Sequence, residues 1–267
     1  MGSRSGPASG AQVDLRKLGV RYSNAVAAAV HDVDLTIEAG TFAVLLGPSG
    51  CGKSTLLRTI NRLVEPTSGT VLIDGGDVRE RDVTELRRRI GYVIQAVGLF
   101  PHYTVAQNIA VVPQLLGWDR ARIDRRVDEL LGSIRLDPAT YRNRKPRELS
   151  GGEAQRVGVA RALAVEPHVL LMDEPFAAVD AIVRASLQDE IARVHAELGT
   201  TVVFVTHDVD EALRLADRIV VMNAGRVVQT DTPANILEHP ADDFVRHLVG
   251  VDAQTRRLAT ERPLIDR

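Results

Sequence analysis

The residues with the clearest chemical potential form a glycine-rich stretch, residues 47–55, which reads Gly-Pro-Ser-Gly-Cys-Gly-Lys-Ser-Thr. It follows an apolar run and opens a helical pattern, which is the context of a phosphate-binding loop. Glycines let backbone N–H groups turn toward phosphate oxygens, and the helix beginning near Lys53 adds the positive end of its dipole. Lys53 would contact the β- and γ-phosphates, and the Ser54 hydroxyl would bind Mg²⁺. The predicted nucleotide ligands are Gly47, Ser49, Gly50, Cys51, Gly52, Lys53, Ser54 and Thr55.

Polar residues stand directly after other apolar runs. These are the pair Asp173 and Glu174, then His207, then Gln95. Ligands of open α/β sheets bind at the carboxyl ends of the strands, so these side chains are expected beside the phosphates. Asp173 would hold Mg²⁺ through water, Glu174 would polarise the attacking water, and Gln95 would face both, which makes Ser54, Gln95 and Asp173 the predicted metal site. His207 alone is more typical of a cap or a surface group, but beside a phosphate loop it is expected to bond to the γ-phosphate.

A second candidate anion site is the sequence Leu-Ser-Gly-Gly-Glu at residues 149–153, which precedes a helical run. Ser150 is a favourable N-cap, and Gly151 and Gly152 expose backbone N–H groups at a helix N-terminus. One nucleotide does not need two such sites far apart in one chain. A head-to-tail pair of chains would instead place this helix end over the partner's γ-phosphate. The simpler alternative is an ordinary capped helix, which a Ser-Gly-Gly sequence alone would favour.

Cys51 is the only cysteine of the chain and lies inside the glycine-rich stretch. Lys53 and a helix N-terminus both lower the pKa of a nearby thiol, so we expect a reactive thiol that bound nucleotide protects. The alternative is an inert small residue, and no catalytic role is expected. A single cysteine also excludes a disulfide framework and a cysteine-rich zinc module.

The pattern of apolar residues predicts a parallel sheet that positions these groups. Short apolar runs typical of buried strands alternate with helical patterns, which favours helices on both faces of the sheet. The expected strands comprise residues 42–46, 90–94, 168–172 and 201–205, followed by a hairpin over 219–228. The helix after the glycine-rich stretch is marked by apolar residues at helical spacing, namely Leu56, Leu57, Ile60 and Leu63.

Two regions depart from this alternation. Residues 12–40 and 69–78 contain short strand patterns with turns, whereas residues 96–158 are almost entirely helical in pattern. We therefore expect an α/β fold with a P-loop NTPase (RecA-like) parallel-sheet core, an N-terminal antiparallel β subdomain and a helical insertion subdomain. Together they would form one domain over residues 12–250.

Composition excludes several classes of protein. The 267 residues carry 33 Lys and Arg against 35 Asp and Glu, a net charge of −2 that gives no electrostatic basis for binding nucleic acid. Residues 1–11 lack the apolar core of a signal peptide and, like residues 251–267, are expected to form a mobile tail. Residues 90–118 contain no Asp, Glu, Lys or Arg, but prolines and amides interrupt them, which argues against a membrane-spanning helix.

Taken together, these residues resemble the ATP-binding subunit of ATP-binding cassette (ABC) transporters. The matching elements are Walker A at 47–55, the Q-loop at Gln95, the signature at 149–153, Walker B with its glutamate at 169–174, and the H-loop at His207. Tyr22 further matches the aromatic that stacks on adenine, and Asp180 matches the D-loop. The resemblance implies ATP and Mg²⁺ as cofactors, Lys53, Gln95, Glu174 and His207 as catalytic residues, and a dimer that shares two ATP sites.

The chain departs from the family pattern in the signature and in the D-loop. Glu153 stands where glutamine is common, but a carboxylate near a helix N-terminus is favourable. The D-loop reads Ala-Ala-Val-Asp at residues 177–180 and keeps Asp180, so coupling between the two sites is expected to survive. Neither change indicates an inactive site.

Within the family, residues 91–118 look most like bacterial importers of glycine betaine, carnitine and choline. The resemblance implies a motor at the cytoplasmic face of the inner membrane that works with integral permease subunits and, indirectly, a solute-binding protein. The motor would be a homodimer or a pair with a second ATPase subunit. Importers of amino acids or related zwitterions share these features and remain an alternative. Many relatives carry a tandem regulatory domain, for which 267 residues leave no room, so built-in osmotic sensing is not expected.

Two other classes of function fit less well. A soluble ABC ATPase that acts on DNA or ribosomes usually has long coiled-coil insertions or a second cassette, and neither fits in 267 residues. A nucleotide-binding regulator without turnover would not need Glu174.

The uncharged stretch after Gln95 is the expected docking surface for the membrane subunit. It contains Leu99, Phe100, Pro101 and Tyr103. Because it follows Gln95 directly, a change at Gln95 when the γ-phosphate binds could be passed to this surface through a short loop. The alternative is that Phe100 packs inside the helical insertion, since aromatic residues are often found in the core.

Overall fold

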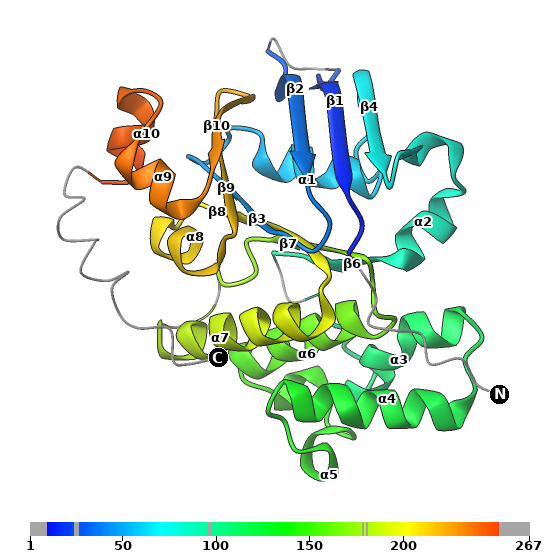
Figure 1. Cartoon of the computed structure of the whole chain (residues 1–267). Coiled ribbons are helices and arrows are strands. Elements are labelled where there is room, and N and C mark those ends of the chain that lie inside the picture. The colour runs from blue at the N-terminus through cyan, green and yellow to red at the C-terminus, as the bar shows by residue number, and fades with distance from the viewer. Residues whose placement is uncertain (1–9, 24–26, 96–97, 178, 180, 251–267) are drawn as a thin grey trace.

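The computed structural model describes residues 10–23, 27–95, 98–177, 179 and 181–250. A six-stranded sheet lies between a smaller antiparallel sheet and a layer of helices (Figure 1). Of the two expected tails, residues 1–9 and 251–267 lie outside the described residues. Gly10 and Ala11, by contrast, donate N–H bonds to the carbonyl oxygens of Gly199 and His168, and Ala11 is buried.

The larger sheet has the strand order β10-β9-β3-β8-β7-β6, and its neighbours pair in parallel except for β10, which is antiparallel to β9. Its strands are β3 (Phe42–Leu46), β6 (Ile90–Val93), β7 (Val169–Asp173), β8 (Thr201–Thr206), β9 (Arg218–Asn223) and β10 (Arg226–Asp231). The smaller sheet has the order β2-β1-β4-β5, with β1 (Val13–Val20), β2 (Val30–Ile37), β4 (Ser68–Ile73) and β5 (Gly76–Asp77). The parallel strands and the hairpin predicted from the apolar runs are therefore present.

The central strand β3 explains why these runs are continuously apolar. Phe42, Val44 and Leu46 belong to the core beneath the sheet, whereas Ala43 and Leu45 belong to the core on the other face. Successive side chains of a strand point to opposite faces, so a strand covered on both sides has no position for a polar residue.

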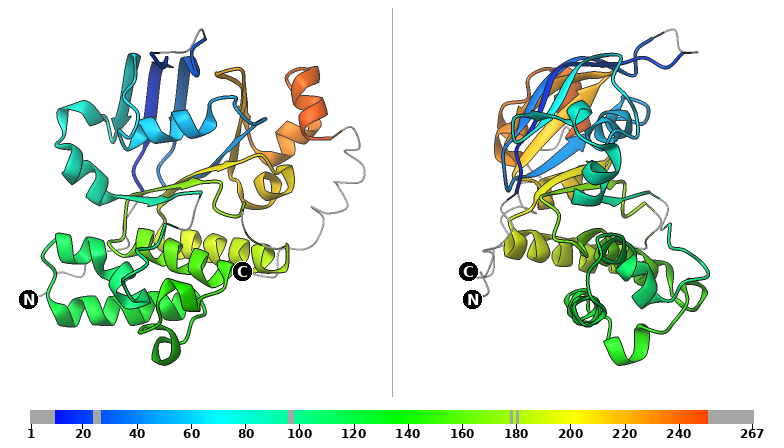
Figure 2. Two further views of the ribbon diagram at one scale, coloured as in Figure 1. Left: turned by 180° about the vertical axis from the view of Figure 1, so that it is seen from behind. Right: turned by 90° about the vertical axis from the view of Figure 1, so that its right-hand side faces the viewer.

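Helices cover both faces of the sheet and build a separate layer below it (Figures 1 and 2). The first group is α1 (Lys53–Ile60), η1 (Val78–Glu80) and α2 (Val83–Arg89). The lower layer comprises α3 (Val105–Leu115), α4 (Arg120–Ser133), α5 (Pro138–Tyr141), η2 (Pro146–Glu148), α6 (Gly151–Leu163) and α7 (Ala181–Leu198). The remaining helices are α8 (Val209–Leu215), α9 (Pro233–Glu238) and α10 (Asp243–Leu248).

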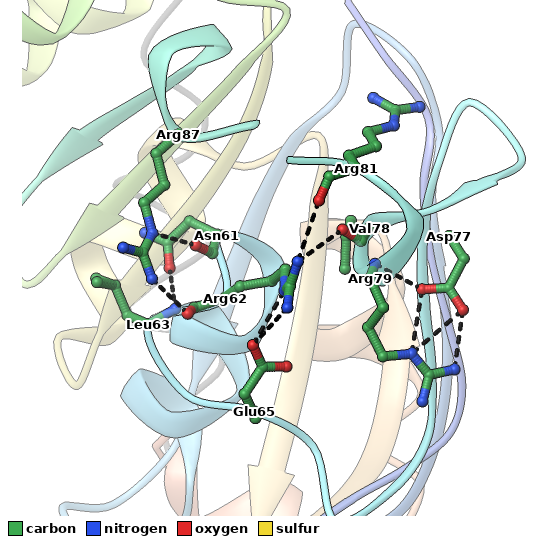
Figure 3. A network of polar contacts seen from close by, with 9 residues as sticks. All are labelled: Asn61, Arg62, Leu63, Glu65, Asp77, Val78, Arg79, Arg81 and Arg87. Atoms are coloured by element: carbon green, nitrogen blue, oxygen red, sulfur yellow. Dashed lines mark hydrogen bonds and ion pairs between the residues drawn. The ribbon is translucent and has the colours of Figure 1, made fainter. Parts of the chain in front are cut away.

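Helix α1 ends earlier than its apolar spacing predicts. Leu63 lies beyond the helix and is 49% exposed, so the prediction from its spacing that it belongs to this helix was wrong. Arg62 adopts a left-handed conformation with φ 55°, and the Leu63 N–H then donates to Arg58 O, as in a Schellman helix end. Figure 3 shows how Arg62 and Arg87 hold this end, since Arg87 donates to the carbonyl oxygens of Asn61 and Arg62.

Candidate nucleotide site

The register of the parallel strands brings the predicted site residues to one edge of the sheet. Leu46 at the end of β3 lies opposite Thr206 of β8, and Asp173 at the end of β7 lies opposite Val205. The glycine-rich loop, the acidic pair and the histidine after β8 therefore leave the sheet together. Gln95 follows β6, the next strand beyond β7.

The glycine-rich loop leads into a helix whose N-terminus has no side-chain cap. Gly52 is the N-cap residue of α1, with φ 104°, and provides no side chain to bond the first-turn N–H groups. The ammonium group of Lys53 donates to the carbonyl oxygens of Gly47, at 2.7 Å, and Pro48, at 3.0 Å. Uncapped N–H groups and a lysine held by the loop itself form a site ready for phosphate oxygens.

Two of the loop glycines are also required by close packing. A Cβ atom at Gly47 would lie 2.2 Å from Met222 O, and one at Gly52 would lie 2.2 Å from Ala29 O. No side chain fits at those distances, so the loop is shaped by its neighbours as well as by its ligand.

Asp173 is held by two side chains from α1. Its Oδ1 atom accepts a hydrogen bond from Ser54 Oγ at 2.7 Å, and its Oδ2 atom pairs with Arg58 Nη2 at 2.9 Å. Tyr92 of β6 completes this group: its pKa is raised by burial and by the Asp173 carboxylate, against the effect of its hydrogen bond to Arg58. Hydroxyl and carboxylate oxygens therefore meet where Mg²⁺ was expected, and such hard oxygen donors suit that ion.

Glu174 lies beside two of the three other predicted catalytic residues, Gln95 and His207. Its Oε2 atom accepts from Gln95 Nε2 at 3.4 Å and lies 3.5 Å from His207 Nδ1. Its backbone has φ 45°, a left-handed conformation that is uncommon without glycine, and its N–H donates to Val205 O at 3.0 Å. A cavity of about 100 Å³ is lined by both Glu174 and His207, which leaves space for water beside the carboxylate.

His207 is positioned by the start of α8. Asp208 caps that helix by accepting from the N–H groups of Asp210 and Glu211, and the Thr206 hydroxyl donates to Glu211 at 2.6 Å. The burial of Glu211 raises the pKa of its carboxyl group, and the Thr206 hydrogen bond opposes this shift. These bonds fix the residues on either side of His207, whose own side chain is 58% exposed.

Tyr22 lies on the other side of the phosphate loop. Its hydroxyl is 3.2 Å from Thr55 Oγ1, and the residue is 47% exposed. The side chain is therefore accessible next to the first turn of α1, which is the arrangement that stacking on a base would need.

The second predicted anion site forms a capped helix N-terminus. Ser150 Oγ accepts from the Glu153 N–H, and the Glu153 carboxylate accepts from the Ser150 N–H at 2.7 Å. The Tyr141 hydroxyl also donates to Glu153, and these bonds lower the pKa of its carboxyl group. Within the described residues, no hydrogen bond or ion pair joins Ser150, Gly151 or Gly152 to the phosphate loop. Asp180 lies outside the described residues.

Cys51 differs from its expected chemistry. The residue is 4% exposed, and burial raises the pKa of its thiol, although Lys53 acts in the opposite direction. The expected lowering of this pKa was therefore wrong, because desolvation of the thiolate outweighs the nearby positive charge. The inert small residue is the better description.

Residues 98–103 are largely exposed. Phe100 is 41% exposed and Tyr103 is 37% exposed, so the alternative that Phe100 is a core residue was wrong. The backbone between them is organised by Asn108 of α3, which is fully buried and bonds both the N–H and the carbonyl of Phe100. Asn108 was not among the predicted functional residues, and neither were Arg58 and Tyr92. Of these three, only Arg58 could have been found from the sequence. It lies four residues after Ser54 in the predicted helix, so both side chains lie on the same helix face.

Within the described ranges, no helix combines the length and the apolar character that crossing a lipid bilayer requires.

Comparison with known proteins places this geometry in a family. The chain is 55% identical to the glycine betaine uptake system ATP-binding protein YehX of Escherichia coli, over 89% of this chain and 77% of that protein. It is 52% identical to the glycine betaine/carnitine/choline transport ATP-binding protein OpuCA of Bacillus subtilis, over 90% of this chain and 62% of that protein. A solved ATP-binding cassette dimer, in a post-hydrolysis state with ADP and Pi, is 33% identical with a TM-score of 0.74, over 83% of this chain and 98% of that chain.

That structural likeness confirms the predicted P-loop NTPase fold. The matched structure is an ATP-binding cassette, so the fold is that of a cassette that binds ATP. The family model for the ABC transporter matches residues 30–177, which include the phosphate loop, the signature sequence and the acidic pair. A match over more than half of the chain, together with these relatives, shows that the chain belongs to the ABC transporter family and carries its ATP-binding cassette.

Proposed function

We propose that this chain is the ATP-hydrolysing motor subunit of a bacterial ABC importer for quaternary-amine solutes such as glycine betaine, carnitine or choline. The observation that carries the proposal is the convergence on Glu174 of Gln95 and His207, one residue beyond Asp173 and its bond to Ser54. The solute class is supported by the two relatives, a glycine betaine uptake subunit and a glycine betaine/carnitine/choline transport subunit.

The residues at the sheet edge fit ATP and Mg²⁺. The backbone N–H groups of residues 49–55 and the Lys53 ammonium would hold the phosphates, with Tyr22 against the adenine. Ser54, Gln95 and Asp173 would supply oxygen ligands or water-mediated contacts to Mg²⁺, which would neutralise charge on the phosphates. Glu174 would accept a proton from the attacking water, and His207 would hold the γ-phosphate.

The separation of the two anion sites supports a head-to-tail dimer. Ser150, Gly151 and Gly152 would close on the γ-phosphate of the partner, either in a homodimer or in a pair with a second ATPase subunit, and Asp180 would couple the two sites. The dimer would work at the cytoplasmic face of the inner membrane with integral permease subunits, and indirectly with a solute-binding protein. Exposed Phe100 and Tyr103, together with Leu99 and Pro101, form the proposed permease contact.

The proposal is tested by transport in a reconstituted system. The chain is co-expressed with the permease and the binding protein encoded beside it, and a thermal-shift screen first identifies the solute that stabilises the binding protein. We expect ATP-dependent uptake of glycine betaine, carnitine or choline in vesicles, and no uptake with Glu174→Gln. Stabilisation by an amino acid and not by a quaternary amine would support the alternative importer class. ATP hydrolysis without association with any permease would overturn the transport role.

A further inference from the structure

The Asp173 carboxylate is nearly inaccessible to water. Its side chain is 2% exposed, and its two oxygens are bonded separately, Oδ1 to Ser54 and Oδ2 to Arg58. A buried carboxylate is costly unless a positive charge and hydrogen bonds compensate for the lost water. The identity of that positive charge therefore decides how Asp173 is held.

Lys53, the positively charged residue of the phosphate loop, does not contact Asp173. Its ammonium group is directed to the carbonyl oxygens of Gly47 and Pro48. Among the described residues, the ion pair of Asp173 is with Arg58 alone, at 2.9 Å. The charge that compensates Asp173 in this structure is thus supplied by a residue outside the glycine-rich stretch.

Arg58 is itself fixed from two sides. It lies on α1 one turn after Ser54, so one helix delivers both bonds to Asp173. Partial burial lowers the pKa of its guanidinium group, but interactions with Tyr92 on β6 and with Asp173 outweigh that effect and raise it. Helix α1 and strands β6 and β7 thereby meet at one guanidinium.

We propose that Arg58 is a positioning residue that holds Asp173 Oδ2, so that Oδ1 stays directed at Ser54 and the metal position. The inference rests on the magnesium site of the proposed function. Arg58 pairs with the oxygen that Ser54 does not contact, so it orients the carboxylate and leaves Oδ1, which would face the metal, to Ser54. Partners that orient a metal ligand in this way typically change metal affinity by about 10- to 100-fold when removed.

Two effects of removing Arg58 oppose one another. Loss of a positive charge would favour a nearby divalent cation, but the 43% exposure of the Arg58 side chain leaves that repulsion screened by water. Loss of the hydrogen bond would let a buried carboxylate rotate away from Ser54. We therefore expect the orienting effect to dominate, and Arg58→Gln to weaken the coupling between Mg²⁺ and nucleotide.

The test measures binding of a fluorescent ATP analogue to the full chain, first in EDTA and then over a Mg²⁺ titration. Arg58→Gln should bind the analogue in EDTA as tightly as the wild type does. It should need an about tenfold higher Mg²⁺ concentration to reach half of the increase in nucleotide affinity that Mg²⁺ causes. Arg58→Lys keeps the charge but not the planar fork of donors and should fall between the two. In steady-state hydrolysis, raised Mg²⁺ should recover the kcat of Arg58→Gln.

Arg62→Gln is the matched control. Arg62 lies just after α1 and bonds Glu65, Val78 O and Arg81 O, but not Asp173 (Figure 3). It should lower the melting temperature and leave the Mg²⁺ dependence unchanged. A wild-type Mg²⁺ dependence in Arg58→Gln and Arg58→Lys, or an equal shift in Arg62→Gln, would overturn the inference. A wild-type chain whose nucleotide binding ignores Mg²⁺ would overturn the magnesium site itself, and the inference with it.

Discussion

At the scale of single residues, the site depends on one carboxylate held in an uncommon backbone conformation. Glu174 has a positive φ, and its N–H donates to β8, which fixes the start of the side chain. Gln95 and His207 then approach the same oxygen atom, Oε2. Uncommon conformations of this kind persist where the surrounding structure enforces them, which is typical of functional sites.

Glu174→Gln should therefore separate binding from hydrolysis. The amide keeps the shape of the side chain but cannot take a proton from water, so ATP binding should remain and hydrolysis should fall by at least about 100-fold. ATP that is bound and not hydrolysed should also hold two chains together. Size-exclusion chromatography with ATP and Mg²⁺ would detect this dimer, and hydrolysis near the wild-type rate would disprove the role of Glu174 as a base.

Cys51 should be poorly reactive in the folded chain. Burial keeps reagents away and raises the pKa of the thiol, so little thiolate is present at neutral pH. A maleimide should label it many-fold more slowly than the same chain in urea, as followed by mass spectrometry, and labelling should become faster as the pH rises. Rapid native labelling at neutral pH would show that the loop opens often.

At the scale of elements, a buried asparagine of α3 organises the loop over residues 100–104, which leaves two aromatic side chains exposed. Asn108 bonds the backbone of residues 100–104 from within α3, so the loop holds its shape while Phe100 and Tyr103 remain exposed. A rigid backbone with exposed aromatic side chains is suited to contact another protein.

Phe100→Ala should distinguish this contact from a role in folding. Because Phe100 is exposed, the free energy of unfolding should change by no more than about 0.5 kcal/mol. Co-purification with the permease should be lost. Phe176→Ala is the core control, since Phe176 is 1% exposed and its loss should cost roughly 3–5 kcal/mol. A similar loss of stability in both variants, measured by urea unfolding, would rule out the docking assignment.

Glu190 on α7 should make stability depend on pH. It is 3% exposed, neither carboxylate oxygen has a hydrogen-bond partner, and burial raises its pKa from the usual 4.5 despite Arg156, Arg135 and Arg193. The folded chain then keeps this proton to a higher pH than the unfolded chain, so stability falls as pH rises through this range.

Glu190→Gln cannot titrate, so its free energy of unfolding relative to wild type should rise as the pH rises above about 4, where the unfolded chain loses the proton first. Urea unfolding at several pH values measures this difference. Glu197→Gln, on the same helix but with a largely exposed side chain, is the control and should show no such trend. A difference that stays constant with pH would show that Glu190 titrates alike in the folded and unfolded states and would contradict the raised pKa.

The elements were more predictable from the sequence than the contacts between them. Continuous apolar runs identified β3, β7 and β8, because strands covered on both faces admit little else. Leu63 was misplaced, because the left-handed turn at Arg62 ends α1 despite favourable spacing. The raised pKa of Cys51 and the bond from Arg58 to Asp173 depend on burial and on strands distant in sequence, which periodicity does not contain.

At the scale of the whole molecule, no bond within the described residues joins the phosphate loop to the capped N-terminus of α6, and in the proposed dimer these are the two halves of one shared ATP site. If each complete site needs both halves, hydrolysis requires two chains to meet, and activity per subunit should rise with protein concentration until the dimer is saturated. ATPase assays over a dilution series measure this directly. Constant specific activity down to nanomolar concentrations would show that one chain is sufficient.

The capped N-terminus of α6 also has a genetic consequence. In the proposed dimer, a chain that has lost Glu174 but keeps Ser150, Gly151 and Gly152 would still complete a normal partner's site while its own site stalls. Where both alleles are expressed equally and pair at random, about one quarter of the dimers would be fully normal, as expected for symmetric pairs. Such mutations should behave as dominant in a merodiploid strain, whereas mutations that prevent folding should be recessive.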